Sequence, residues 1–200
     1  MERKEYSAGA VKMSFWFVEF RKVVQLLCDG KSMDEIKVLA QSENIFAAPT
    51  ALRCNQIYST VAGRIKSLDQ SFIPFFLSGD LATQKLYALI ATMAYDTLFF
   101  DFVYEVIREK MIVGSNELTD SDVRVFFKNK QQQNEKVAGW TDATLVRLGR
   151  CYKTMLYEAG VIDKSKMART ILKPIFDPEL SRWLEQNDMA IYEKALTGVK

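Results

Sequence analysis

The chain contains no histidine, and this limits the chemistry that its side chains could carry out. A Ser-His-Asp triad, an HExxH zinc site and an imidazole general base are therefore excluded. The three cysteines, Cys28, Cys54 and Cys151, form no CxxC pair, so neither a zinc knuckle nor a disulfide framework is indicated. The glycine motifs that cradle phosphates are also absent. The sequence predicts a protein that is not an enzyme and needs no cofactor or metal.

One group of carboxylates has the spacing of a metal-dependent nuclease. Glu35-Ile36-Lys37 follows Asp29 and Asp34 and matches the E-x-K half of such a site. A nuclease site holds its carboxylates on adjacent strands around a divalent cation. Here Ser32 and Glu35 have the spacing of a capping box at a helix start. We therefore interpret Glu35 as structural.

A second acidic group recurs every four residues at Asp101, Glu105 and Glu109, which places all three on one helix face. Like charges at this spacing repel weakly. A basic partner or an arginine of the same chain would relieve this repulsion, although a solvated helix surface is the simpler interpretation.

Basic residues are concentrated in the last third of the chain. Residues 124–173 contain eleven Lys and Arg against four Asp and Glu, a net charge of +7, whereas residues 69–118 carry −4. On the helix predicted for 141–159, three basic side chains lie opposite the apolar stripe. A basic helix precedes it and a possible basic hairpin follows it, which is the element order of a winged helix-turn-helix. A solvated helix surface is the alternative.

Such a surface would bind duplex DNA through its phosphates, with affinity but little sequence preference. The predicted DNA-binding residues are Arg124, Lys128, Lys130, Arg147, Arg150, Lys153, Lys164, Lys166, Arg169 and Lys173.

The helix pair predicted for 32–41 and 49–68 is a second candidate, because Asn and Gln side chains can bond adenine edges. Its connector is longer than that of a standard helix-turn-helix, and an ordinary exposed face is the alternative. The residues proposed there are Arg53, Asn55, Gln56, Arg64 and Lys66.

The elements that must position these residues are mostly helices. Apolar residues repeat with the 3.6-residue period over long stretches, including 14–28, 81–112 and 141–159. The one place where a short β-hairpin is credible is 161–176. We predict a mainly α, compact helical protein with helix-turn-helix-like pairs and a wing-like hairpin near the C-terminus. Its three parts would be an N-terminal helical subdomain at 1–68, central hydrophobic helices at 69–118 and a basic winged-helix-like subdomain at 119–200.

A cytoplasmic location fits the unpaired cysteines. No uncharged run approaches the roughly 20 apolar residues of a membrane span, so we expect no membrane partner.

Several short segments carry a resemblance to a known family. They lie in the same order over nearly the whole chain and are Tyr6-Ser7-Ala8-Gly9, Phe17-Val18-Glu19, Gly30-Lys31-Ser32-x-x-Glu35-Ile36, Glu43-Asn44, Arg64-Ile65-x-x-Leu68 and Asp177-Pro178-Glu179-Leu180. With these segments the sequence resembles the BrxA family of BREX bacteriophage-exclusion systems. The resemblance implies a mostly helical fold, likened to that of the antitermination protein NusB, and supplies no catalytic residues.

The family resemblance also implies DNA binding beside methyltransferase, phosphatase-like and ATPase components. The expected function is therefore a non-enzymatic accessory protein of phage defence that binds double-stranded DNA and contacts other BREX components. Two alternatives stay open: a protein-interaction adaptor that binds no nucleic acid, and a NusB-like RNA-binding protein.

Overall fold

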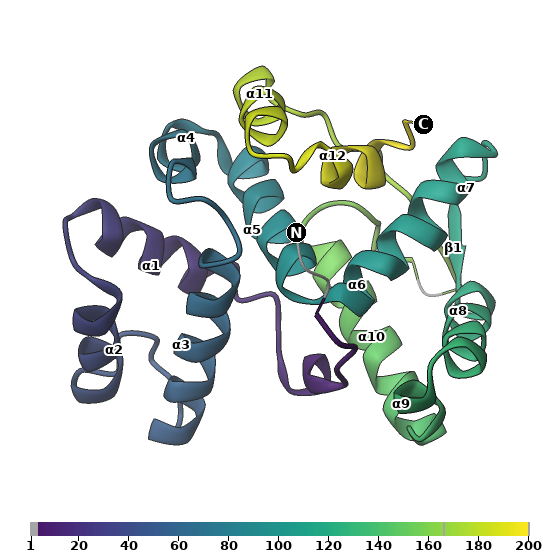
Figure 1. Cartoon of the computed structure of the whole chain (residues 1–200), viewed down its shortest axis with the longest axis horizontal. Helices are drawn as coiled ribbons and strands as arrows, with labels where there is room; N and C mark the ends of the chain where they lie inside the picture. The colour runs from purple at the N-terminus through teal and green to yellow at the C-terminus, as the bar shows by residue number, and fades with distance from the viewer. Residues whose placement is uncertain (1–3, 166, 200) are drawn as a thin grey trace. The chain divides into compact units, whose positions relative to one another are not determined.

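The computed structural model describes residues 4–165 and 167–199, and these residues form two compact units. The continuous unit is Phe15–Tyr95; the split unit combines the residues up to Ser14 with those from Asp96 onward. Both units are built mostly of helices (Figure 1), which confirms the prediction of a mainly α protein. The predicted three-part division at residues 68 and 118 stays a prediction.

The continuous unit consists of five helices among its described residues. Four aromatic rings, those of Phe20, Phe72, Phe76 and Tyr87, fill its core with centroids 5.6–6.3 Å apart. Its helices are α1 (Phe17–Cys28), α2 (Met33–Ser42), α3 (Ala51–Ile65), α4 (Phe72–Ser78) and α5 (Leu81–Tyr95).

The split unit begins with a short 3-10 helix and continues after Asp96. Its helices α6, η2 and α7 follow one another without a break, and the middle one, η2, is a π-helix. Its elements are η1 (Gly9–Lys12), α6 (Thr97–Phe102), η2 (Val103–Arg108), α7 (Glu109–Ile112), β1 (Glu117–Thr119), α8 (Asp120–Gln133), α9 (Glu135–Ala138), α10 (Asp142–Glu158), β2 (Ala168–Thr170), α11 (Pro178–Gln186) and α12 (Ala190–Thr197).

Polar side chains set where several helices begin. The predicted capping box of Ser32 and Glu35 is present at the start of α2. The Asp96 side chain accepts the amide protons of Leu98 and Phe99, so the periodic stretch 81–112 is divided at Asp96, where a new helix begins. The helix expected from Pro49 begins two residues later, because Thr50 is its N-cap.

The sheet is small and confirms the expected hairpin near the C-terminus. Val161 and Ile162 pair with Ile171 and Leu172 through an antiparallel bridge and a 2.7 Å hydrogen bond from the Leu172 amide to the Val161 carbonyl. The residues just before Ile171 form β2, which pairs antiparallel with β1 so that Leu118 lies opposite Arg169. The pairing with β1 was not predicted.

The core of the split unit is also aromatic. The ring of Tyr152, on α10, lies 4.9 Å from that of Phe99, 5.6 Å from that of Phe102 and 6.1 Å from that of Phe127. α6, α8 and α10 are thereby joined around one side chain, which fixes the faces that α8 and α10 turn outward.

Over residues 4–165 and 167–199 no single helix is long and apolar enough to cross a membrane, and only α5 taken with the bent stretch after it, Thr97–Ile112, passes by length and composition.

Candidate nucleic-acid interface

Helix α10 presents the central part of the basic surface. Its buried stripe includes Leu145, Leu148 and Tyr152, and this stripe turns Arg147 and Arg150 toward solvent. Thr141 caps the helix by accepting the amide proton of Thr144. Both arginines are therefore exposed on one face of an anchored helix, as predicted.

Helices α8 and α10 approach each other closely where glycine faces valine. A Cβ atom built on Gly149 would lie 2.5 Å from Cγ1 of Val123, so only glycine permits this spacing. Lys153 lies one turn after Gly149 on α10, and Asp120 lies about one turn before Val123 on α8. The close packing thus brings the lysine to the first turn of α8.

Asp120 is the point at which basic side chains from three elements meet. The Lys153 ammonium of α10 donates a hydrogen bond to Asp120 Oδ1, and Arg169 Nη1 of β2 lies 3.9 Å from the same oxygen. The hydrogen bond from Lys153 and the charges of Lys153, Arg169 and Arg124 hold the pKa of Asp120 below its ordinary value, although partial burial opposes them. We call these four residues the Asp120 cluster.

Strand pairing explains why Arg169 joins this cluster. Leu118 of β1 faces Arg169 of β2, and β1 runs directly into α8. Thr119 and Asp122 form a capping box at this junction, which fixes the first turn of α8. The unpredicted strand β1 is therefore the element that places an arginine beside Asp120.

The predicted residues of this region differ in how far they reach solvent. The exposed ones are Arg124 and Lys128 on α8, Arg147 and Arg150 on α10, and Lys164 and Lys173 on either side of β2. Lys153 and Arg169 are largely covered, with 12% and 21% of their side-chain surface exposed. Lys166 lies outside the described residues.

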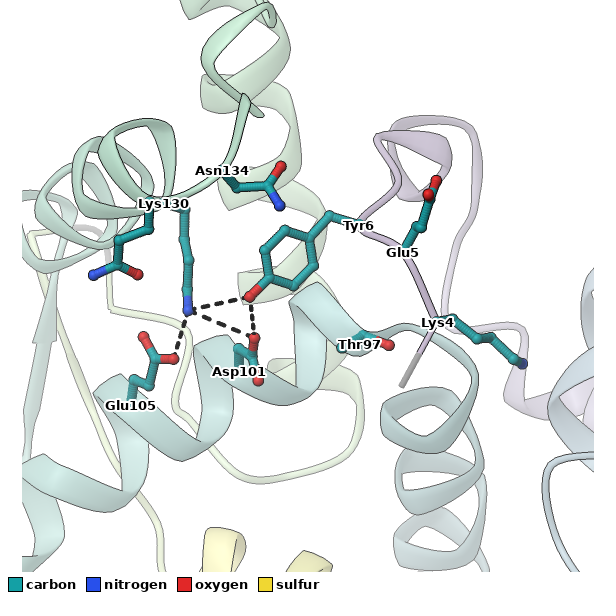
Figure 2. A pocket seen from close by; sticks show the side chains of 9 residues that line it. Lys4, Glu5, Tyr6, Thr97, Asp101, Glu105, Lys130 and Asn134 are labelled. Atoms are coloured by element: carbon teal, nitrogen blue, oxygen red, sulfur yellow. Dashed lines mark hydrogen bonds and ion pairs between the residues drawn. The ribbon is translucent and has the colours of Figure 1, made fainter. Parts of the chain in front are cut away.

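The structure corrects the prediction for Lys130, which is only 4% exposed. Its ammonium donates a 2.5 Å hydrogen bond to Glu105 Oε1 and lies 3.5 Å from Asp101 Oδ2 (Figure 2). Burial lowers the pKa of Lys130, but these partners outweigh it and raise the pKa above its ordinary value. The buried residues of α8 are Val123, Phe126, Phe127 and Lys130. Lys130 thus continues the apolar period of the helix, and this period is the sequence signal that could have predicted its burial.

Lys130 also ties down the N-terminal segment. The Tyr6 hydroxyl donates a 2.6 Å hydrogen bond to Asp101 Oδ2 and accepts one of 3.4 Å from Lys130 (Figure 2). These groups border a polar cavity of about 350 Å³ whose lining includes Thr97 and Asn134. Asp101 and Glu105 thus have a lysine of the same chain as their basic partner, and Glu109 instead bonds Arg108 at 2.6 Å.

A correction of the same kind applies to Arg64 in the continuous unit. Its side chain is 1% exposed, donates a 2.6 Å hydrogen bond to the Phe15 carbonyl oxygen and lies over the Trp16 ring. Arg64 was predicted as a DNA-binding residue of an exposed helix face. The structure buries a second side of α3 against the backbone that leads into α1.

The other residues of the second candidate surface are only partly available. Arg53 donates a 2.7 Å hydrogen bond to Gln56 and lies 4.9 Å from the centre of the Trp16 ring. Asn55 and Gln56 are half-buried, and Lys66 alone of the five proposed residues is exposed. The structure therefore brings together fewer basic groups here than on the split unit.

The carboxylate groups do not form a metal site in the part of the chain that the structure describes. Glu35 accepts hydrogen bonds from the Ser32 amide and hydroxyl, both 2.7 Å, and these bonds hold the pKa of Glu35 below its ordinary value. The capping box accounts for this residue, as predicted from its spacing.

Comparison with known proteins places the whole chain in one group. Residues 4–188 match the model of the family BrxA. A "BREX protein BrxA" of Bacillus cereus (strain H3081.97) is 40% identical over 198 residues, which cover 99% of each chain. Another of the same name from Escherichia coli O9:H4 (strain HS) is 20% identical over 178 residues, covering 88% of this chain and 84% of its own.

A solved structure has the same fold. The crystal structure of an uncharacterized protein from Magnetospirillum magneticum superposes with a TM-score of 0.81, covers 98% of this chain and 100% of its own, and is 19% identical.

Proposed function

The chain belongs to the BrxA family of BREX phage-defence proteins, and from this membership we propose that it is a non-enzymatic accessory protein that binds duplex DNA. It works in the cytoplasm beside other BREX components and grips the duplex mainly through phosphates. The observation that carries the proposal is the meeting of basic side chains from α8, α10 and β2 around Asp120.

The order of elements in the split unit supports this surface as the site. A helix that ends at α7 is followed by β1, α8, a connector that contains the short helix α9, then α10 and two paired extended segments. The same order occurs in winged helix-turn-helix proteins, where the helix in the position of α10 lies in the major groove. Arg147 and Arg150 would then reach the duplex from α10, and Lys164 and Lys173 from the paired segments.

Phosphate contacts give this proposal a sharp test. If each of the six exposed cations contacts a phosphate, raising the salt concentration from 50 to 200 mM should weaken duplex binding about a thousandfold. The double variant R147E/R150E should bind at least tenfold more weakly and reduce the salt slope by about two.

The matched control is R182E, which reverses an exposed arginine on α11 of the same unit. Its duplex affinity should stay within twofold of that of the natural protein. If R147E/R150E and R182E lose affinity equally, α10 is not the contact surface.

A protein-interaction adaptor is the second candidate, favoured by the exposure of two apolar side chains near β2. Met167 is 91% exposed and Ile175 is 93% exposed. A contiguous exposed apolar patch is typical of a surface that binds proteins, and in this proposal the two side chains contribute to such a patch. The substitutions M167S and I175S should leave duplex affinity unchanged and weaken retention of BREX components if the adaptor function is present.

Binding of RNA, the third possibility, is decided by competition. Labelled duplex DNA bound to the protein should be displaced by unlabelled duplex at a lower concentration than by single-stranded DNA or by RNA of equal length.

A further inference from the structure

Asp120 is an acidic side chain at the centre of a basic surface. It is 57% exposed, whereas the Lys153 and Arg169 side chains that face it are 12% and 21% exposed. The two cations are therefore largely buried, and the carboxylate oxygen that both of them face belongs to the more exposed side chain.

Both cations are directed at the same atom. Lys153 donates a hydrogen bond to Asp120 Oδ1, and Arg169 Nη1 is 3.9 Å from that oxygen. Carboxylate and phosphate oxygens accept charge-assisted hydrogen bonds from the same ammonium and guanidinium donors. A phosphate oxygen of the duplex in this place would meet two donors that are already positioned, but Asp120 would repel it.

We propose that the Asp120 carboxylate occupies a phosphate-binding position of this protein and must move aside before Lys153 and Arg169 engage the DNA backbone. The inference rests on the proposed function and adds an internal competitor to it. Duplex affinity is consequently set below what the basic residues alone would give, and Asp120 regulates it.

The local structure makes this idea testable with one substitution. Thr119, not Asp120, caps α8, and Asp122 completes the capping box and pairs with Lys110 at 2.9 Å. Asn at position 120 keeps the size of the side chain and removes only its charge, so α8 should begin at the same residue. Circular dichroism and the unfolding midpoint will show whether D120N is folded.

The experiment compares duplex affinity and its salt dependence in the natural protein and in D120N. Removing one negative charge about 4 Å from a bound phosphate should tighten binding fivefold to tenfold. Two cations released from Asp120 should steepen the salt slope by about one to two. The control E185Q neutralises an exposed carboxylate on α11 and should change affinity less than twofold.

The opposite role for Asp120 gives the opposite result. If the carboxylate only positions Lys153 for binding, D120N will bind more weakly, and that outcome overturns the inference. Unchanged affinity in D120N, with the natural protein binding duplex, also overturns it while leaving the proposed function intact. If neither protein binds duplex, the proposed function fails and this inference fails with it.

A second variant identifies which groups the phosphate meets. In a background of K153Q/R169Q, the further change D120N should no longer tighten binding, because the donors that Asp120 covers are gone. A gain of fivefold or more in that background would show a general charge effect and would overturn the assignment to Lys153 and Arg169.

Discussion

Gly149 and Val123 are packed so closely that a single methyl group at position 149 would collide with the valine. This contact sets the distance between α8 and α10. The same distance brings Lys153 to Asp120, so the packing of the unit and the arrangement of its basic surface depend on one glycine.

We expect G149A to destabilise the protein and to disturb the Asp120 cluster. The added Cβ would overlap Val123 Cγ1 at 2.5 Å, and overpacking of this kind costs about 1–3 kcal/mol. Denaturant unfolding measures the loss. In the control G139A the new Cβ would have its nearest neighbour at 3.6 Å, and the unfolding free energy should change by less than about 0.5 kcal/mol. Equal stability of the two variants would contradict the role given to Gly149.

Substitution of two lysines that lie two residues apart on α8 should affect different properties, stability for Lys130 and duplex binding for Lys128. K130M leaves Asp101 and Glu105 without their buried cation and should lower the unfolding free energy by about 3–5 kcal/mol. K128M removes an exposed charge, so it should leave stability within about 0.5 kcal/mol and weaken duplex binding. Urea unfolding and a binding titration of both variants distinguish them. A stable K130M would show that the buried ion pairs do not hold this unit together.

In the continuous unit, Arg64 and Lys66 form a similar pair. R64M removes the hydrogen bond to the Phe15 carbonyl and should cost about 1.5–3 kcal/mol of stability. K66M alters an exposed side chain and serves as the control. Thermal unfolding should separate the two variants by several degrees. If K66M instead reduces duplex affinity as strongly as R147E/R150E, the second candidate surface contributes to binding.

Acid should destabilise the protein partly through Asp122. Burial raises the pKa of Asp122, but hydrogen bonds from Thr119 and Lys110 outweigh it and hold the pKa below its ordinary value. A carboxylate of this kind stabilises the fold above its unfolded pKa, and the contribution is lost as pH falls through the folded pKa. The unfolding free energies of the natural protein and D122N should therefore converge as pH falls from 7 to 3. Parallel curves would contradict this.

The sequence predicted helices and caps better than it predicted which charges reach solvent. Ser32 with Glu35 is a local signal, since a capping box involves residues three apart, and it is present at the start of α2. Lys130 and Arg64 were misplaced because burial of a charge depends on partners far along the chain. Lys130 is held by Tyr6 and Glu105, which precede it by 124 and 25 residues.

The strand β1 escaped prediction for a related reason. Glu117–Thr119 is too short to show a strand pattern, and its pairing with β2 joins residues about fifty apart. Arg169 could be named as a candidate DNA-binding residue from its charge alone. Its position beside Asp120 could not, because that position depends on the pairing of Leu118 with Arg169.

The anchoring of Tyr6 on Asp101 and Lys130 has a consequence for the order of events on the ribosome. Residues up to Ser14 belong to a unit whose remainder is translated only after Tyr95. At about 5–20 residues per second, the 124 residues between Tyr6 and Lys130 take roughly 6–25 seconds to emerge. The continuous unit can fold during that delay, before Lys130 is available to bond Tyr6. The Asp120 cluster forms later still, because Arg169 of β2 is translated after Lys130.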